Sequence, residues 1–249
     1  MLIKNFVVGF VNTNCYIVGY ERTKEAAVID PGFNDDEGKK ILGGIKNNNL
    51  TIRYIINTHA HTDHTSGNKI LKRETGAEIV IHKNDAPLLP EPWKGFLEMI
   101  KLQKITPCPA CGSQSVNLKV FENKEKAVLK CNECGFSIDL LASPPADRTL
   151  EDGDIIEIGN YKFQVIHTPG HTSGSISLYC KEEKILFSGD TLFAGSIGRT
   201  DLPYSSAEEI MYSLKEKLMT LPDNTLVYPG HGDVTTIGKE RKTNPYIHI

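Results

Sequence analysis

The most constraining feature of this sequence is a cluster of four potential metal ligands within six residues. The stretch reads Thr58-His59-Ala60-His61-Thr62-Asp63-His64. It directly follows residues 52–57, whose branched apolar side chains predict a buried strand. Three histidines and an aspartate in one turn add nothing to a hydrophobic core, and protonated histidines would repel one another. Because one loop cannot complete the coordination of two ions, the chain must fold so that distant segments return to this strand end.

Three later segments have the form that such a convergence needs. Residues 168–172, 188–191 and 228–232 each follow an expected strand and carry one candidate ligand. Tight turns rich in Pro and Gly project a single side chain from the edge of a sheet. Imidazole and carboxylate groups together suit Zn²⁺, Fe²⁺ or Mn²⁺. The predicted ligands are therefore His59, His61, Asp63, His64, His171, Asp190 and His231. The remaining histidines, including His82, His167 and His248, are interpreted as ordinary solvated or core residues.

The pattern of apolar residues predicts one α/β domain spanning residues 1–249. Strands are expected at 6–8, 15–18, 26–30, 52–57, 77–82, 155–158, 161–167, 176–179, 184–187 and 226–228, and helices at 35–46, 67–75, 91–105 and 207–221. The first 20 residues suggest two strands rather than a secretory signal, and no stretch is long enough to span a membrane. With 28 basic and 31 acidic residues, the net charge of -3 does not favour a nucleic acid as the main partner.

Four of the six cysteines form two identical Cys-x-x-Cys-Gly motifs. They are Cys108, Cys111, Cys131 and Cys134, with 19 residues between Cys111 and Cys131. This spacing predicts a zinc ribbon inserted at residues 106–141, with alternating apolar residues forming a hairpin. A redox pair and unrelated cysteines are the alternatives. A closed Cys₄ site has no open position for substrate, so its Zn²⁺ is expected to be structural. The segment would then stabilise its own loop, cover the catalytic site or dock a partner.

The two other cysteines, Cys15 and Cys180, are assigned to strand packing. Because the cysteines do not suggest a framework of disulfides, the composition favours a protein of the reducing cytoplasm.

The spacing of the predicted ligands resembles the metallo-β-lactamase superfamily over nearly the whole chain outside the cysteine segment. Residues 59–64 match its H-x-H-x-D-H signature, and the later ligands follow in its order. The resemblance implies an αβ/βα sandwich with the site at the shared edge of two sheets. It assigns His59, His61 and His171 to one metal, places Asp63, His64 and His231 on the other, and makes Asp190 the bridge. Zn²⁺ is the first expectation for both ions, with Fe or Mn as alternatives.

A site of this kind implies hydrolysis by a bridging hydroxide. Two cations lower the pKa of a shared water from near 16 toward about 7, so hydroxide forms at neutral pH. The first metal would stabilise the oxyanion that develops on an ester-like carbonyl. Asp63 is the expected catalytic residue, orienting the water or accepting its proton.

Within the superfamily, the sequence is most similar to the short bacterial and archaeal form of the glyoxalase II group. The likeness lies in Asn14-Cys15-Tyr16, residues 195–201 and residues 229–232. It implies a thioesterase that acts on a small hydroxyacyl-thiol. Arg199 is the candidate substrate-binding residue, unless it only pairs with Asp201. The longer enzymes add basic residues from a C-terminal domain. Arg241 and Lys242 either replace these or belong to a solvated tail at 238–244.

Two other functions are compatible with the motifs. A persulfide dioxygenase also carries a Gly-Arg-Thr-Asp segment, but it uses a mononuclear iron and leaves the second site empty. Those enzymes replace the final Pro-Gly-His-Gly, which this chain retains at 229–232. A nucleic-acid-processing protein is the third hypothesis, although the additional motifs of such enzymes are missing.

Overall fold

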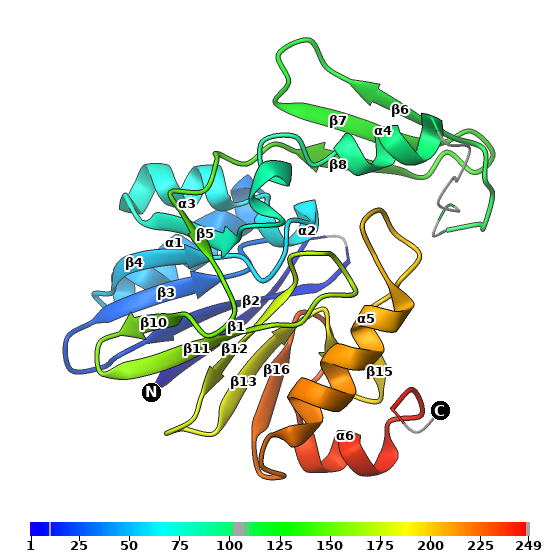
Figure 1. Cartoon of the computed structure of the whole chain (residues 1–249). Coiled ribbons are helices and arrows are strands. Elements are labelled where there is room, and N and C mark those ends of the chain that lie inside the picture. Colours follow the sequence, from blue (N-terminus) through cyan, green and yellow to red (C-terminus); the bar gives the residue numbers. More distant parts are fainter. Residues whose placement is uncertain (10, 102–107, 109, 248–249) are drawn as a thin grey trace.

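The computed structural model describes residues 1–9, 11–101, 108 and 110–247. Two six-stranded sheets pack face to face (Figure 1). The first has the order β1-β2-β3-β4-β5-β9. Its strands are β1 Leu2–Val8, β2 Thr13–Gly19, β3 Glu25–Ile29, β4 Thr51–Ile56, β5 Glu78–His82 and β9 Arg148–Leu150. The second has the order β10-β11-β12-β13-β16-β17. Its strands are β10 Ile155–Ile158, β11 Tyr161–His167, β12 Ile176–Cys180, β13 Ile185–Gly189, β16 Leu226–Pro229 and β17 Thr235–Thr236.

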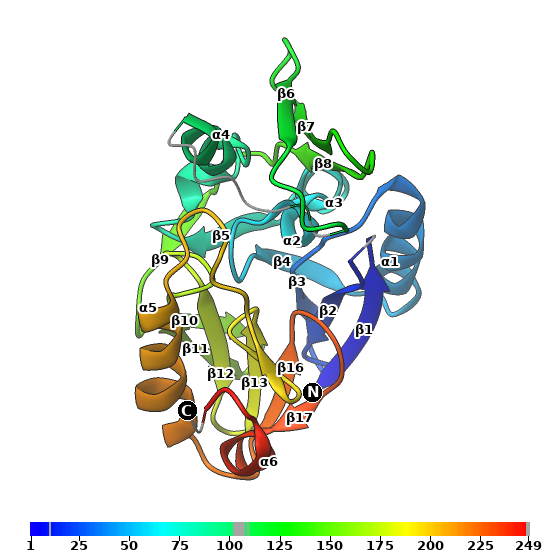
Figure 2. The same cartoon turned by 90° about the vertical axis from the view of Figure 1, so that its right-hand side faces the viewer.

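Helices cover the outer face of each sheet, which gives the αβ/βα sandwich expected from the sequence (Figure 2). The first sheet is covered by α1 Asp35–Asn47 and α3 Asn68–Thr75, with α2 Thr62–Thr65 and η1 Ala86–Leu88 in its loops. The second is covered by α5 Ala207–Tyr212, η2 Ser213–Lys217, η3 Leu218–Thr220 and α6 Ile237–Thr243. A short hairpin, β14 Leu192–Phe193 and β15 Ser196–Ile197, follows β13.

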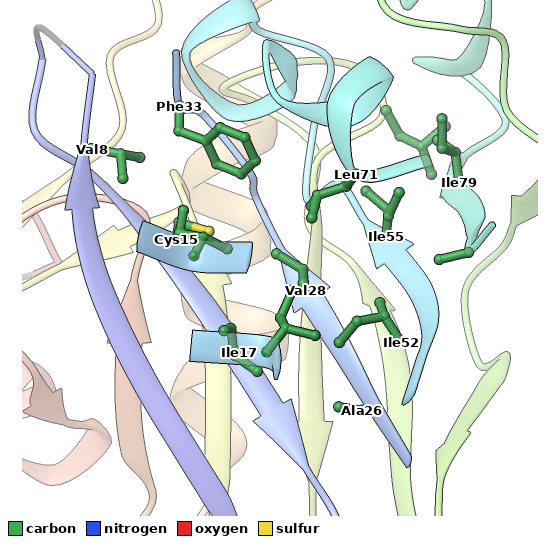
Figure 3. Packing of buried hydrophobic residues seen from close by; sticks show 14 of the residues in the cluster. Val8, Cys15, Ile17, Ala26, Val28, Phe33, Ile52, Ile55, Leu71 and Ile79 are labelled. Atoms are coloured by element: carbon green, nitrogen blue, oxygen red, sulfur yellow. The ribbon is translucent and has the colours of Figure 1, made fainter. Parts of the chain in front are cut away.

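Side-chain alternation along the central strands builds two layers of core at once. Along β2, Cys15 and Ile17 face the helices, whereas Tyr16 and Val18 face the second sheet. Figure 3 shows the first of these layers, a cluster that contains Ile17, Val28 of β3 and Leu71 of α3. Cys180 is buried between the sheets. Both cysteines therefore have the packing role expected of them.

The topology gathers the polar loops at one edge of the sandwich. Strands β3, β4, β5 and β9 run parallel, as do β13 and β16, so the carboxyl ends of neighbouring strands lie together. The backbone N–H of Ile176 donates to the carbonyl of Thr58 at 2.9 Å, and an isolated bridge pairs Thr13 with His231. These contacts join the two sheets at the edge where the predicted ligands lie.

The cysteine segment forms a separate three-stranded antiparallel sheet. Its strands are β6 Val116–Val120, β7 Lys126–Cys131 and β8 Ser137–Leu141. Because β5 pairs directly with β9, the chain leaves the first sheet and returns to the adjacent position after this excursion. The sheet packs on α4 Lys94–Lys101 through its own apolar cluster, beyond the end of the sandwich (Figure 1). The hairpin expected from the alternation is confirmed, and β8 is an addition to it.

Three sequence predictions need correction. The helix expected at 91–105 begins only at Lys94 and is described to Lys101; residues 102–105 lie outside the described residues. The helix expected at 207–221 changes to π-type hydrogen bonding at Ser213 and to 3-10 spacing at Leu218. Its apolar stripe still faces the sheet, which explains why periodicity alone missed the change. The tail at 238–244 belongs to the capped helix α6, which buries Glu240 but leaves Lys239 and Lys242 exposed.

No helix among the described residues is long and apolar enough to cross a membrane.

Candidate metal centre

The ligand-bearing loop after β4 is held in place by a buried carboxylate at the end of β3. Asp30 accepts hydrogen bonds from the backbone N–H of Thr58 at 2.8 Å and from its hydroxyl at 2.7 Å. Its Oδ2 also lies 3.0 Å from Nδ1 of His64. A carboxylate on one ring nitrogen fixes the orientation of a histidine and leaves the other nitrogen for a metal. Asp30 therefore positions both the start and the end of the loop.

The first group of nitrogens comes from both sheets. Nδ1 of His61 lies 3.0 Å from Nε2 of His59 and 2.9 Å from Nε2 of His171. Ligands around a tetrahedral ion with bonds near 2.05 Å are about 3.4 Å apart, so a small expansion would admit an ion. The Nδ1 of His171 lies 2.9 Å from the backbone carbonyl of Arg199, which aims Nε2 at the group.

The second group has nearly equal spacings. Nε2 of His64 lies 3.2 Å from Nε2 of His231, and Oδ2 of Asp63 lies 3.3 Å from the first nitrogen and 3.4 Å from the second. The carbonyl of Val11 is 3.2 Å from Nδ1 of His231 and orients that ring. These three distances between ligand atoms match the separation expected around one tetrahedral ion.

Asp190 lies between the two groups. Its Oδ2 is 3.4 Å from Nε2 of His171 and 3.4 Å from Nε2 of His231, and its Oδ1 is 3.4 Å from Nε2 of His64. Oδ1 is buried and makes no hydrogen bond within the described part of the chain. A buried carboxylate oxygen without a donor is costly unless a cation neutralises it. The donor set thus fits a pair of divalent ions, with Asp190 placed to contact both.

Without metal ions, burial and the surrounding charges give these groups strongly shifted pKa values. Burial and the neighbouring His171 lower the pKa of His61 to about 3. Burial opposes protonation of His64, but Asp190, Asp63 and Asp30 outweigh it and hold its pKa well above the usual value. Burial likewise opposes ionisation of Asp190 and is outweighed by His64 and His231, so the pKa of Asp190 falls well below normal. Asp190 and Asp63 also outweigh burial at His231 and raise its pKa to about 9. Without metal ions, the cluster therefore combines ionised carboxylates and neutral imidazoles at His59 and His61 with protonated imidazoles at His64 and His231, and binding of a metal to the second group would release those protons.

Further contacts brace the two loops that bring ligands from the second sheet. Asp85 accepts from the N–H of Ala60 at 2.9 Å and from the Thr172 hydroxyl at 2.8 Å, so it ties the loop after β4 to that after β11. The Asn14 side chain donates to the carbonyls of Pro229 at 3.0 Å and Gly232 at 2.9 Å. Asn14 thus holds the turn that carries His231.

Sequence reasoning missed Asp30 and Asp85, because an isolated acid has no spacing pattern. Asp30 at the end of one expected strand and Asp85 three residues past another were the available signal.

Arg199 lines the cavity above the ligand group, but its side chain is already paired. Nε of Arg199 donates to Oδ1 of Asp201 at 2.6 Å, and Nη2 donates to Oδ2 at 2.7 Å. The cavity has a volume of about 650 Å³ and is bounded by five of the predicted ligands. The pairing with Asp201 is confirmed, whereas binding of a substrate by Arg199 stays a prediction.

Arg241 does not line the cavity, and its side chain is engaged in contacts within the sandwich. Its guanidinium donates to the carbonyls of Met219, at 2.6 and 3.1 Å, and Leu221, at 2.7 Å, and pairs with Asp223. These contacts fasten α6 to the turn before β16. His82 and His167 also lie outside the ligand group; their rings stack at 4.0 Å, and burial lowers the pKa of His82 to about 4.

The four cysteines of the inserted segment meet in one cluster. The sulfurs of Cys108 and Cys134 are 3.7 Å apart, as are those of Cys111 and Cys131, and all four lie within 4.8 Å of one another. Bonds of 2.3 Å to a tetrahedral Zn²⁺ would place sulfurs about 3.8 Å apart. Backbone N–H groups of the second motif, led by that of Cys134, lower the pKa of Cys131 to about 7.

The fold and the ligand groups define a sandwich protein built to bind divalent metals. The model of the metallo-beta-lactamase superfamily matches residues 8–231. The chain belongs to this superfamily of metallo-hydrolases.

Similar proteins differ in activity. The chain is 30% identical to hydroxyacylglutathione hydrolase GloC of Haemophilus influenzae, over 94% of this chain and 92% of the relative. It is 29% identical to the mitochondrial persulfide dioxygenase ETHE1 of Bos taurus, over 95% of this chain and 72% of the relative. Among solved structures, the B3 metallo-beta-lactamase BLEG-1 has a TM-score of 0.75 and 30% identity, covering 99% of both chains. TTHA1623, solved in a di-iron-bound form, has a TM-score of 0.72 and 30% identity over 98% of this chain and 99% of its own.

Proposed function

We propose that this protein is a thioesterase of the glyoxalase II kind, which hydrolyses a small hydroxyacyl-thiol at a two-metal site. The observation that carries the proposal is the second ligand group, Asp63, His64 and His231, whose ligand atoms lie 3.2 to 3.4 Å from one another. A mononuclear enzyme has no use for a second group with this spacing. The likeness to hydroxyacylglutathione hydrolase GloC supports the same activity.

Each predicted ligand has a role in this proposal. His59, His61 and His171 would hold one ion, and Asp63, His64 and His231 the other, with Asp190 contacting both. When bound, the ions would lower the pKa of a water between them toward about 7 and polarise the thioester carbonyl. Zn²⁺ is the first candidate, with Fe or Mn as alternatives.

Asp63 is the proposed catalytic residue. Its Oδ2 faces the ligand groups and accepts a hydrogen bond from the Thr13 hydroxyl at 3.2 Å, which fixes the carboxylate. From there it can orient the attacking water and take its proton. The Asp30 and Asp85 carboxylates keep the surrounding loop in place during this transfer.

We further propose that the four clustered cysteines bind a structural Zn²⁺ and form a zinc ribbon within residues 106–141. Residues 106 and 107 lie outside the described residues, so the boundary stays a prediction. The N–H of Gly112 bonds to the Cys108 carbonyl at 2.8 Å, and the second motif repeats this turn from Gly135 to Cys131 at 3.2 Å. Both glycines have positive φ, 73° and 75°. Two matching turns that present four sulfurs support a closed Cys₄ site.

The persulfide dioxygenase is the alternative, favoured by the likeness to ETHE1. The deciding experiment supplies S-lactoylglutathione and, separately, glutathione persulfide, and records both thiol release and oxygen consumption. We expect thiol release without oxygen uptake. Oxygen uptake with the persulfide and no thioester hydrolysis would establish the alternative.

His231→Ala makes the same distinction through the second metal. In a two-metal hydrolase, the variant loses one ion and loses about a hundredfold in rate at pH 7, with partial recovery at higher pH because the attacking water is then less acidic. His82→Gln, at a histidine outside both ligand groups, is the control. Unchanged metal content and unchanged hydrolysis in His231→Ala would contradict the assignment.

A further inference from the structure

The cavity above the ligand groups has an apolar wall supplied by the inserted segment. Phe136, Ile138 and Leu140 line it from β8 and the turn before β8, and Phe96 lines it from α4. The same cavity is lined by five of the predicted ligands, which come from the sandwich. The inserted sheet, which lies beyond the end of the sandwich (Figure 2), thus supplies part of the cavity wall.

This wall is anchored to the ligand-bearing loop. The backbone N–H of Leu141, at the end of β8, donates to the hydroxyl of Thr62 at 2.9 Å, next to Asp63 in α2. Leu140 is only 4% exposed and packs with Trp93 and Ala127 in the apolar cluster of the segment. The hydrogen bond and the packing therefore tie this surface to the loop that carries the ligands.

The rest of the cavity lining has few charged side chains that lack a partner. Phe193, Ile197 and Leu202 continue the apolar surface on the side of the sandwich. Among the described residues that line the cavity, Arg199 is the one Lys or Arg, and Asp201 already accepts hydrogen bonds from its Nε and Nη2. A substrate that carries several carboxylates would leave these charges unpaired beside apolar surface, which is costly.

We propose that the inserted segment is a substrate-recognition wall and that the preferred substrates are thioesters with an apolar aliphatic or aromatic group on one side of the sulfur. This inference rests on the thioesterase activity proposed above and specifies its substrate class. The cavity of about 650 Å³ has room for a ring or a short chain in addition to the reacting carbonyl. The apolar group lies against Phe136 and Ile138, and the carbonyl points to the metal ligands.

The test is a pair of substrate series assayed on the metal-loaded protein. One series lengthens the acyl group from acetyl through butyryl and hexanoyl to phenylacetyl on N-acetylcysteamine. The other keeps acetyl and enlarges the thiol from methanethiol to butanethiol and benzyl mercaptan. We expect kcat/KM to rise about fourfold for each buried methylene in one of the two series, until the cavity is full.

Variants then assign the effect to the inserted segment. Ile138→Ala should lower kcat/KM for the favoured apolar substrate about tenfold more than for its acetyl or methyl counterpart. Leu118→Ala is the matched control, because Leu118 packs in the same three-stranded sheet but does not line the cavity. Leu118→Ala should leave the ratio of kcat/KM for the favoured apolar substrate to kcat/KM for its acetyl or methyl counterpart unchanged.

The outcomes separate the two proposals. Hydrolysis that rises in neither series, or that is fastest for S-lactoylglutathione, overturns the apolar wall and leaves the thioesterase intact. No hydrolysis of any thioester overturns the thioesterase. Because the wild-type series is informative alone, the result does not depend on the stability of a variant.

Discussion

Gly230→Ala adds one methyl group at the most crowded point of the ligand cluster. A Cβ at this position would lie 2.1 Å from Oδ1 of Asp190 and 2.8 Å from Cε1 of His64. Gly230 does not have a positive φ, so alanine can adopt its backbone conformation. The substitution therefore tests the contact with the ligands rather than the strain of the turn.

The expected effect follows from the size of the overlap. To restore a separation of 3.0 Å from 2.1 Å, the Asp190 carboxylate must move by about 0.9 Å. Metal–ligand distances tolerate changes of about 0.2 Å, so Asp190 can no longer contact both ions. A misplacement near 1 Å costs roughly a hundredfold in rate, or about 2.7 kcal/mol of transition-state stabilisation.

The assay pairs metal analysis of the purified variant with thioester hydrolysis at saturating substrate. We expect fewer bound metals at the sandwich edge and a kcat reduced about a hundredfold. Gly43→Ala is the control, because nothing lies within 4 Å of a Cβ at that helical position. It should retain metals and activity. If Gly230→Ala keeps a full metal complement and at least half of the wild-type kcat, the assignment of Asp190 as the shared ligand is wrong.

Three further substitutions test the residues that position the site. Asp30→Asn should weaken metal binding tenfold to a hundredfold, because His64 loses the carboxylate that orients it; unchanged metal affinity would refute this role. Asp85→Ala should lower the free energy of unfolding by about 2 kcal/mol, measured with urea, since the buried N–H of Ala60 loses its acceptor. Arg241→Ala should destabilise the fold by about 2 kcal/mol and leave KM unchanged, whereas a raised KM would restore a substrate role.

The ligands could be predicted because their signals are local. A cluster such as His59 to His64 has no use in a core, and His171, Asp190 and His231 each follow a strand that ends in a tight turn. Short runs of apolar residues between turn residues likewise predicted most strands, since both signals are local. Both predictions needed no knowledge of distant contacts.

What escaped prediction depends on contacts between distant segments. Glu240 is buried because it accepts from the Gly195 N–H at 2.8 Å and from the Thr235 hydroxyl at 2.5 Å, and these contacts turn an apparently solvated tail into α6. Arg241 reads as a free cation until the carbonyls that it binds are known. Asp30 and Asp85 escaped for the same reason. A buried polar residue is explained by its partners, and a local pattern does not reveal them.

The division of ligands between the sheets links metal binding to the docking of the sandwich. Each group takes two ligands from the loop after β4 in the first sheet and one from the second, His171 or His231. Asp190, which adjoins both groups, also comes from the second sheet. Each ion would therefore cross-link the sheets at the edge where only a few backbone hydrogen bonds join them. Because ligands that converge only in the folded state make binding energy part of folding energy, the two ions would stabilise the catalytic cavity as well as supply its chemistry.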